Sequence, residues 1–314
     1  MLKFAGDALI CMFGGSNEDV DDSVEDLALR AIQCGIEIQT NLKEYDSNEG
    51  FKLTLHIGIG AGDLHAVFVG GVEDSWEFLV IGDPLLQLKT AVDNSQSGEV
   101  VVSEKVWKMV NKRCEGVAKN DSDWHVKRVK NSIKVRPTKT FEISPMVEKA
   151  LRCFIQKNVQ IKIDSFHISW LAELRQTSVI FIKLSGLTYN PKEDLKLLVI
   201  HNVLRSMQEV VFRFEGMVRQ FLVDDKGTVL IAVFGVPPYK HIDDPIRAIK
   251  TALEISESLE KRSMHHAIGI TTGSVFCGSV GSERRQEYAM VGDTVKIDFP
   301  HLISSMNEFK HSFS

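Results

Sequence analysis

The chain has 314 residues, 44% of them hydrophobic and 25% charged, which is enough for two globular domains with separate cores. Its formal net charge of -5 gives no electrostatic reason to expect nucleic acid or an anionic membrane as a partner. The five cysteines are scattered without a C-x-x-C pair, which argues against a disulfide framework. No apolar run is long enough to span a bilayer, so we predict a cytoplasmic protein without a transmembrane segment.

The first half of the chain reads as a hairpin, a helix and strands. Residues 1–7 have the pattern of the middle of a strand hairpin, so we expect the sequence to be truncated at this end. An apolar strand ends at Phe13-Gly14, and an acidic stretch then leads into a pattern of helical period around residues 30–38. A glycine-containing β-type run at 56–62 and a strand at 78–83 complete this half.

The second half repeats this order. It begins with a β-branched strand at 177–184 and a helix-like segment at about 195–212, which have no counterpart in the first half. The elements that match the first half one by one are an apolar strand at 229–235, a helical pattern at 247–255, a β-type run at 267–273 and a strand at 288–293. Agreement at four successive places predicts two homologous α+β domains.

The run Gly58-Ile59-Gly60-Ala61-Gly62 does not match a nucleotide-binding loop. It lacks the G-x-G-x-x-G spacing and the Lys-Ser/Thr pair of a P-loop. We therefore interpret these residues as strand glycines that allow another element to pack closely.

The repeated blocks resemble those of the class III nucleotide cyclases. The segment Lys3-Phe4-Ala5-Gly6-Asp7-Ala8-Leu9 is similar to the family's strand hairpin. Val80-Ile81-Gly82 and Met290-Val291-Gly292 are similar to the strand before the family's substrate-contacting helix. The resemblance is to the tandem catalytic core of soluble, bicarbonate-responsive adenylyl cyclases in particular.

This resemblance implies two ferredoxin-like cyclase domains that form an intramolecular pseudo-dimer, both of them incomplete. The implied segments are a first cyclase domain at 1–145 without its N-terminal strand and helices, a connector at 146–174, a second cyclase domain at 175–296 without its C-terminal part, and a divergent tail at 297–314.

The family's chemistry implies roles for particular residues. Such cyclases convert ATP to cyclic AMP and pyrophosphate, with two Mg²⁺ or Mn²⁺ ions held by carboxylates. By this resemblance Asp7 is the second metal-binding aspartate, and the first is expected on a strand preceding Met1. Lys183 stands where the second domain's own aspartate would be, as expected where only one domain holds metal.

The nucleotide positions of the second half depart from the family pattern. Gln220 stands where soluble cyclases have an adenine-reading lysine, and Ala289 where they have a threonine. Lys296 and Pro300 occupy the places of the asparagine and the arginine that stabilise the transition state. Proline also interrupts the helix expected there.

The degenerate site matches better. Lys3, Val80 and Lys89 correspond to positions that contact bicarbonate in the soluble enzyme. Lys89 replaces an arginine, so a planar, bidentate contact with the anion becomes a point charge. Ordinary solvent-facing lysines remain the alternative for both cations.

The resemblance predicts a soluble adenylyl cyclase-like protein of intracellular signalling that is impaired or inactive as this chain alone. Its expected partners are ATP and bicarbonate, and another cyclase domain could pair with it; no nucleic acid is expected. One alternative is a non-catalytic regulatory module that binds bicarbonate or nucleotide. Another is a truncated product whose unpaired sheet edges make it unstable.

Overall fold

A computed structural model describes residues 3–5, 8–14, 23–43, 54–134, 143–164, 173–187, 194–224, 227–282 and 285–292. The chain divides into two compact units, Met1–His65 with Ile81–Phe141, and Ala66–Val80 with Glu142–Ser314. Both units combine helices with mainly antiparallel sheets, so the predicted α+β class is confirmed. The predicted domain boundaries stay a prediction.

The first unit begins with the hairpin that the sequence predicts. Strand β1 (Lys3–Ala5) pairs antiparallel with β2 (Ala8–Ile10). Lys3 lies opposite Ile10 and Ala5 opposite Ala8, and residues 6 and 7, with Asp7, lie outside the described residues.

A separate sheet forms the core of the first unit. Its described strands follow the order β3-β6-β8-β7, with β3 and β6 parallel and the other pairs antiparallel. The strands are β3 (Ile57–Ile59), β6 (Val100–Ser103), β7 (Cys114–Ala118) and β8 (Asp123–Val129). The helices of this unit are α1 (Val24–Lys43), α2 (Asp83–Asp93) and α3 (Glu104–Val110).

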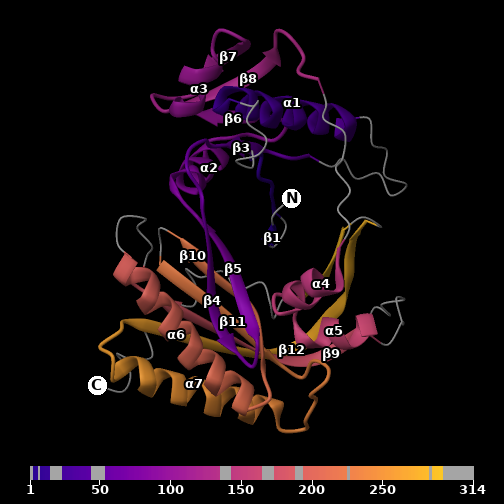
Figure 1. The fold of residues 1–314 in the computed structure, drawn as a ribbon, viewed down its shortest axis with the longest axis vertical. Coiled ribbons are helices and arrows are strands. Elements are labelled where there is room, and N and C mark those ends of the chain that lie inside the picture. Colours follow the sequence, from indigo (N-terminus) through magenta and orange to yellow (C-terminus); the bar gives the residue numbers. More distant parts are fainter. Residues whose placement is uncertain are drawn as a thin grey trace. The chain divides into compact units, whose positions relative to one another are not determined.

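Successive residues of β3 and of the segment just after it face opposite sides of the sheet, as the period of two in a strand requires, and different helices cover the two sides. Ile59 belongs to the buried cluster that α1 and α3 form with the sheet. Gly58 and Gly60 face α2: a Cβ at Gly58 would lie 2.6 Å from Val92 Cγ2, and one at Gly60 would lie 2.4 Å from the Pro84 carbonyl oxygen. The predicted role of these glycines in close packing is therefore confirmed. Figure 1 shows α2 beside β3.

Among the described residues of the second unit, five strands form a sheet with the order β10-β11-β9-β12-β13, and all neighbours are antiparallel. The strands are β9 (Glu173–Leu184), β10 (Met217–Asp224), β11 (Gly227–Phe234), β12 (His266–Ser282) and β13 (Arg285–Val291). The first four strands, with a helix after the first and the third, have the order of a ferredoxin-like fold. This confirms the fold predicted for the second half.

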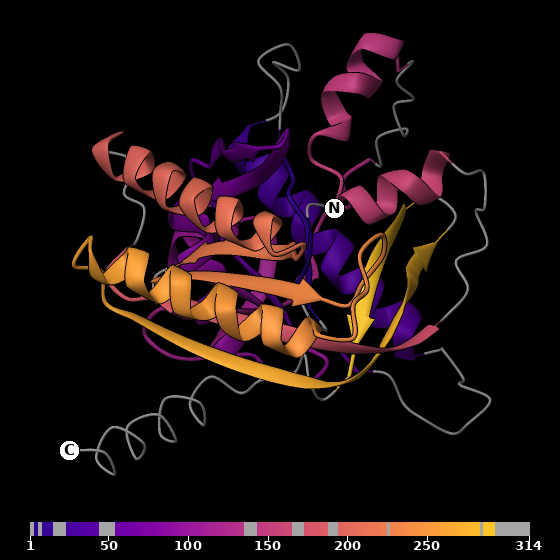
Figure 2. The same cartoon turned by 90° about the horizontal axis from the view of Figure 1, so that it is seen from below.

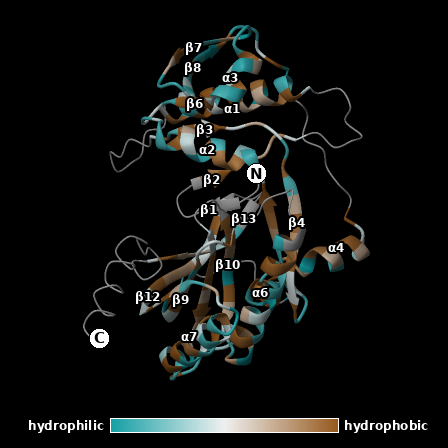
Figure 3. Cartoon of the chain, turned by 90° about the vertical axis from the view of Figure 1, so that its left-hand side faces the viewer, coloured by the Kyte–Doolittle hydropathy of each residue, from teal (hydrophilic) through white to brown (hydrophobic). Residues whose placement is uncertain are grey.

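Two helices, α6 (Asp194–Arg213) and α7 (Asp244–Glu260), pack side by side on this sheet (Figure 2). Helix α7 buries one face, including Ala248, Ala252 and Ile255, and exposes the other (Figure 3). Two shorter helices, α4 (Pro145–Arg152) and α5 (Lys157–Asp164), precede the sheet in the chain, and Val159 of α5 packs against its core. None of the described helices combines the length and hydropathy needed to cross a membrane.

The hairpin of β4 (His65–Val72) and β5 (Ser75–Ile81) comes from the first half of the sequence but lies almost wholly in the second unit. Within the described residues, β4 and β5 pair only with each other, as a two-stranded sheet. This hairpin therefore ties the first half of the sequence to the fold of the second.

Candidate functional site

The central strand of the second unit carries Lys183, which the resemblance predicts to stand at the position of a metal-binding carboxylate. Lys183 is half-buried near the end of β9 and lies opposite Val229 of β11 and Ala267 of β12. An ammonium group repels Mg²⁺ rather than coordinating it, since hard cations take oxygen ligands. Within the described residues, no three His, Cys, Asp or Glu side chains gather as a metal site.

Gln220 and Ala289 lie on the two outermost strands of this sheet. Gln220 lies opposite Ile231, directly after a bulge in β10, and Ala289 lies opposite Gly278. Four strand spacings separate β10 from β13, which is about 19 Å in a flat sheet.

An ion pair nevertheless joins these two strands. Arg219 Nη2, in the bulge, lies 3.5 Å from Glu287 Oε1, and both side chains are mostly shielded from solvent. The Arg219 carbonyl oxygen also accepts a hydrogen bond of 3.0 Å from the Gln156 side chain. The sheet must therefore curve, and the curvature brings the strands of Gln220 and Ala289 within side-chain reach. Sequence reasoning missed this pair because neither residue belongs to a motif.

Burial changes the pKa of Tyr288, the residue before Ala289. The side chain of Tyr288 is buried, and this burial raises its pKa well above the usual value, with a smaller contribution from Cys277. The phenol is therefore neutral over the physiological pH range, and its ring is part of the buried core.

The predicted bicarbonate positions are distributed over both units. Lys3 is on β1 and Lys89 is half-buried on α2, both in the first unit, whereas Val80 is on β5 in the second. Lys296 and Pro300 lie outside the described residues. These assignments stay predictions.

A buried amide holds the β4–β5 hairpin on the second unit. Gln208 of α6 is fully buried, accepts a hydrogen bond of 3.4 Å from the Val72 N–H, and donates one of 3.0 Å to the Ser75 carbonyl oxygen. A Cβ at Gly70 would lie 2.8 Å from the Gln208 side chain, and the φ of Gly70 is +95°. Glycine at this position thus permits the close approach.

Further contacts extend this attachment. The Trp76 N–H donates a hydrogen bond of 2.9 Å to the Cys153 carbonyl oxygen, and Lys157 forms an ion pair with Glu73. The ring of Phe68 lies 5.2 Å from that of Phe154. The hairpin is therefore bonded to α6 and to the segment that carries α4 and α5.

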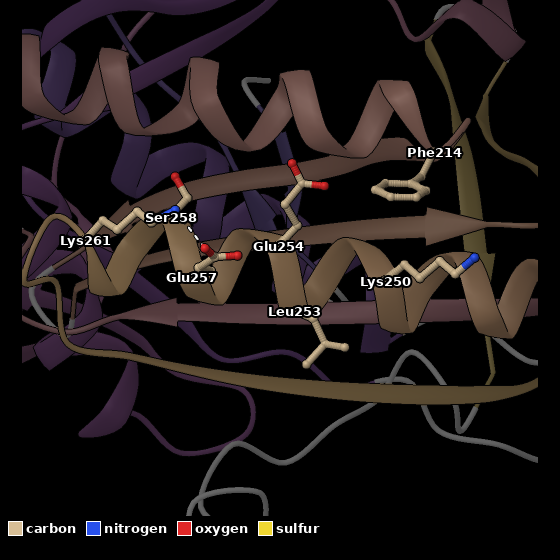
Figure 4. A pocket seen from close by; sticks show the side chains of 7 residues that line it. All are labelled: Phe214, Lys250, Leu253, Glu254, Glu257, Ser258 and Lys261. Atoms are coloured by element: carbon tan, nitrogen blue, oxygen red, sulfur yellow. Dashed lines mark hydrogen bonds and ion pairs between the residues drawn. The ribbon is translucent and has the colours of Figure 1, made fainter.

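A surface depression of the second unit does not carry a comparable site. It has a volume of about 630 Å³ and lies along the exposed face of α7, with lining residues that include Phe214, Leu253 and Glu254 (Figure 4). Two ion pairs lie on its surface: Lys261 Nζ lies 2.7 Å from Glu257 Oε1, and Glu254 pairs with Arg213. Exposed pairs of this kind contribute little energy and indicate a solvated helix face.

The fold defines an α+β protein with a ferredoxin-like second half. Over 329 residues the chain is 25% identical to adenylate cyclase type 10 of Oryctolagus cuniculus and 24% identical to that of Homo sapiens. Each match covers 95% of this chain and 20% of the relative, so the chain spans about a fifth of these proteins. These matches confirm the predicted resemblance to the class III cyclases. No family model matches the chain.

Solved structures give weaker similarity. The guanylyl cyclase Cya2 is 27% identical over 40% of this chain and 67% of its own, with a TM-score of 0.34. A bacterial light-regulated adenylyl cyclase is 16% identical over 52% of this chain and 50% of its own, with a TM-score of 0.43.

Proposed function

We propose that the chain is an adenylyl cyclase-like domain pair of cyclic AMP signalling that makes little or no cyclic AMP alone. The proposed ancestral reaction is the conversion of ATP to cyclic AMP and pyrophosphate, with a divalent metal. Support for the reaction class comes from the similarity to adenylate cyclase type 10 over 95% of the chain. The observation that carries the proposed loss of activity is the chemistry of the second half's nucleotide positions.

The substitutions proposed for the second half would remove hydrogen-bond donors that stabilise the transition state. An asparagine and an arginine would stabilise charge on the phosphoryl oxygens, and losing even one such preorganised donor lowers turnover by roughly 10² to 10³. Lys296 supplies charge without the amide's geometry, and Pro300 supplies no donor at all. Gln220 can both donate and accept, so we infer weaker discrimination between purine bases than a lysine would give.

The test is cyclic AMP formation by the purified chain with Mn²⁺ and ATP, with and without bicarbonate. A thermal melt on the same sample establishes that it is folded, and an active class III cyclase serves as the positive control. We expect no product above the no-enzyme background. Clear turnover would show that other residues replace the asparagine and the arginine.

A second candidate function is a regulatory module that binds bicarbonate. What favours it is that Lys3 and Lys89 stand where the resemblance predicts contacts with the anion. Calorimetry should show saturable heat with bicarbonate, and Lys89→Ala should remove it. Lys108→Ala is the matched control, because Lys108 forms an exposed pair of 2.7 Å with Glu104. No heat from the unsubstituted chain would eliminate this candidate.

A further inference from the structure

Strand β12 has a neighbouring strand on both sides only along its second half. It pairs with β9 from His266 to Cys277, whereas β13 pairs with it only from Phe276 to Ser282. Within the described part of the chain, the other edge of residues 266–275 therefore has no strand beside it. An uncovered edge presents backbone N–H and C=O groups that can pair with another strand.

The hydrogen-bond pattern shows which backbone groups face this edge. The Ser185 N–H donates a hydrogen bond of 3.0 Å to the His265 carbonyl oxygen. Hydrogen-bonded pairs of an antiparallel ladder recur at every second residue, so the next residue that bonds to β9 is Ala267. The N–H and C=O groups of Ile268, and those of Ile270 two residues further on, therefore point away from β9 and toward the open edge.

The composition of β12 is unusual for an edge strand. Its 17 residues include no Asp, Glu, Lys, Arg or Pro. By contrast, the outermost strands among the described residues carry charges: β10 has Arg219 in a bulge, and β13 has Glu287. Charges, prolines and bulges are the usual means by which a protein prevents a new strand from pairing with an edge. Residues 266–275 have none of these and thus suit an edge that another strand covers.

The first unit covers the corresponding edge with a strand. The run at 56–62 matches the run at 267–273, so Ile57 corresponds to Ile268. Strand β6 pairs parallel with β3, and the Ile57 N–H donates a hydrogen bond of 3.0 Å to the Glu99 carbonyl oxygen. The N–H group that points to the open edge of β12 thus corresponds to one that holds a parallel strand in the first unit.

The helices beside these strands differ in the same way. Ile32 of α1 corresponds to Ile249 of α7, and Ile36 corresponds to Leu253. Ile32 is 0% exposed, and Ile36 packs against the same core cluster, which includes two valines of β6. Ile249 and Leu253, however, are 49% and 67% exposed. The second unit therefore leaves open an apolar surface that corresponds to the one that β6 covers in the first unit.

The next pair of matching helix residues shows the reverse difference. Ile38 of α1 is 37% exposed, whereas Ile255, its counterpart on α7, is 1% exposed. Helix α7 packs on β9, a strand without a counterpart among the described residues of the first half. Each helix thus exposes apolar side chains where its unit lacks a strand that the other unit has.

We propose that the open edge of β12 binds a parallel β-strand supplied by another polypeptide. The backbone groups of Ile268 and Ile270 bond to this strand, and its alternate side chains pack against Ile249 and Leu253 of α7. Because the edge carries no charged residue, the partner segment is uncharged and β-branched, as Val100–Val102 of β6 is. In such strand addition the main-chain bonds give affinity and alternate side chains give specificity. Binding at this edge requires neither nucleotide nor metal, so it is independent of the cyclase-like function.

The probe is a fluorescent peptide with the sequence of residues 98–104, added to the full chain. Fluorescence anisotropy should show saturable binding with a dissociation constant of about 10–100 µM, because one short strand forms an interface below the standard size.

Two N-methylated peptides test whether backbone bonds hold the probe. The bond from Ile57 to Glu99 implies that the Val101 N–H faces β3, whereas the Val102 N–H faces β8 on the other side of β6. N-methylation of Val101 should weaken binding at least about tenfold, because it removes a hydrogen bond and leaves the opposite carbonyl group unpaired. N-methylation of Val102 is the matched control and should leave binding unchanged.

A substitution in the chain locates the binding surface. Ile249→Ser removes apolar area beside the open edge, so affinity for the peptide should fall about fivefold. Leu198→Ser is the matched control, because Leu198 is 55% exposed on α6, which packs on β10 and α7. Amide hydrogen exchange at Ile268 and Ile270 should be fast in the free chain and slower with the peptide.

Several results would overturn the proposal. Equal binding of the two N-methylated peptides would show adhesion through side chains only. Absence of binding, with slow exchange at Ile268 and Ile270 in the free chain, would show that the edge is already occupied. Light scattering would then assign the edge to a second copy, if the chain is a dimer, or to residues of the same chain, if it is a monomer. Binding that is lost with Val101 methylation and weakened by Ile249→Ser, but retained with both controls, supports the proposed edge.

Discussion

Replacing Gln208 by alanine tests whether its amide holds the β4–β5 hairpin on the second unit. The substitution removes two hydrogen bonds, with Val72 and Ser75, and leaves the backbone groups of both residues without that partner. Each bond contributes about 1 kcal/mol, and the 3.4 Å bond contributes less than the 3.0 Å bond. The emptied volume at a fully buried position adds to the loss. We expect the free energy of unfolding to fall by about 2–3 kcal/mol in total.

Urea denaturation of the purified variant measures this loss, and amide hydrogen exchange at Val72 shows whether it is local. Exchange at Val72 should accelerate more than exchange in the central strand β9. Glu209→Ala is the control, because Glu209 is exposed on the same helix and should change stability by less than about 0.5 kcal/mol. A loss below about 0.5 kcal/mol for Gln208→Ala, with unchanged exchange at Val72, would refute the assigned role.

Two further outcomes are expected in the first unit. Gly60→Ala should lower the melting temperature through a loss of about 1–3 kcal/mol, because its Cβ would lie 2.4 Å from the Pro84 carbonyl oxygen. Gly14→Ala is the control, since its nearest contact would be an ordinary 3.7 Å, and equal effects of the two would contradict the packing argument. Burial raises the pKa of Glu99, but hydrogen bonds from Lys119 and from the Gln96 N–H, with the charge of His125, outweigh it and lower that pKa below 4.5. Because the folded-state pKa is depressed, this stabilisation is present above pH 4.5 and is lost as the pH falls through the folded-state pKa. In Glu99→Gln the free energy of unfolding should therefore depend less on pH in this range. A pH profile identical to that of the unsubstituted chain would contradict the prediction.

Local patterns in the sequence were sufficient for most of the elements. The apolar period of the segments around 30–38 and 247–255 predicted α1 and α7, and the β-branched run at 177–184 predicted β9. Such patterns report which face of an element is buried but not which element covers it. The apolar run at 78–83 therefore indicated β5, which ends at Ile81, but not that its hairpin belongs to the second unit.

The hairpin did leave signals that could have been used. Gly70 and Gly71 are adjacent and both have a positive φ, which glycine adopts at low cost. Gln208 is a polar residue flanked by buried apolar neighbours on α6, including Met207 and Val211. A buried amide in an apolar face calls for hydrogen-bond partners, but only the tertiary structure identifies them as backbone groups of the hairpin.

The packing of β9, β11 and the start of α7 against one another could not be predicted from sequence patterns for the same reason. Thr177, Gly235 and Asp244 are separated by many residues and meet only because β9, β11 and α7 pack together. Their arrangement also affects how the second half is interpreted. The positions that the resemblance assigns to metal or nucleotide, such as Lys183, have no direct cost in stability. A buried carboxylate oxygen without a protein partner does have such a cost, and a well-packed apolar residue would avoid it. The buried Asp244 therefore lowers the stability of the second half near the beginning of β9, the end of that strand away from Lys183.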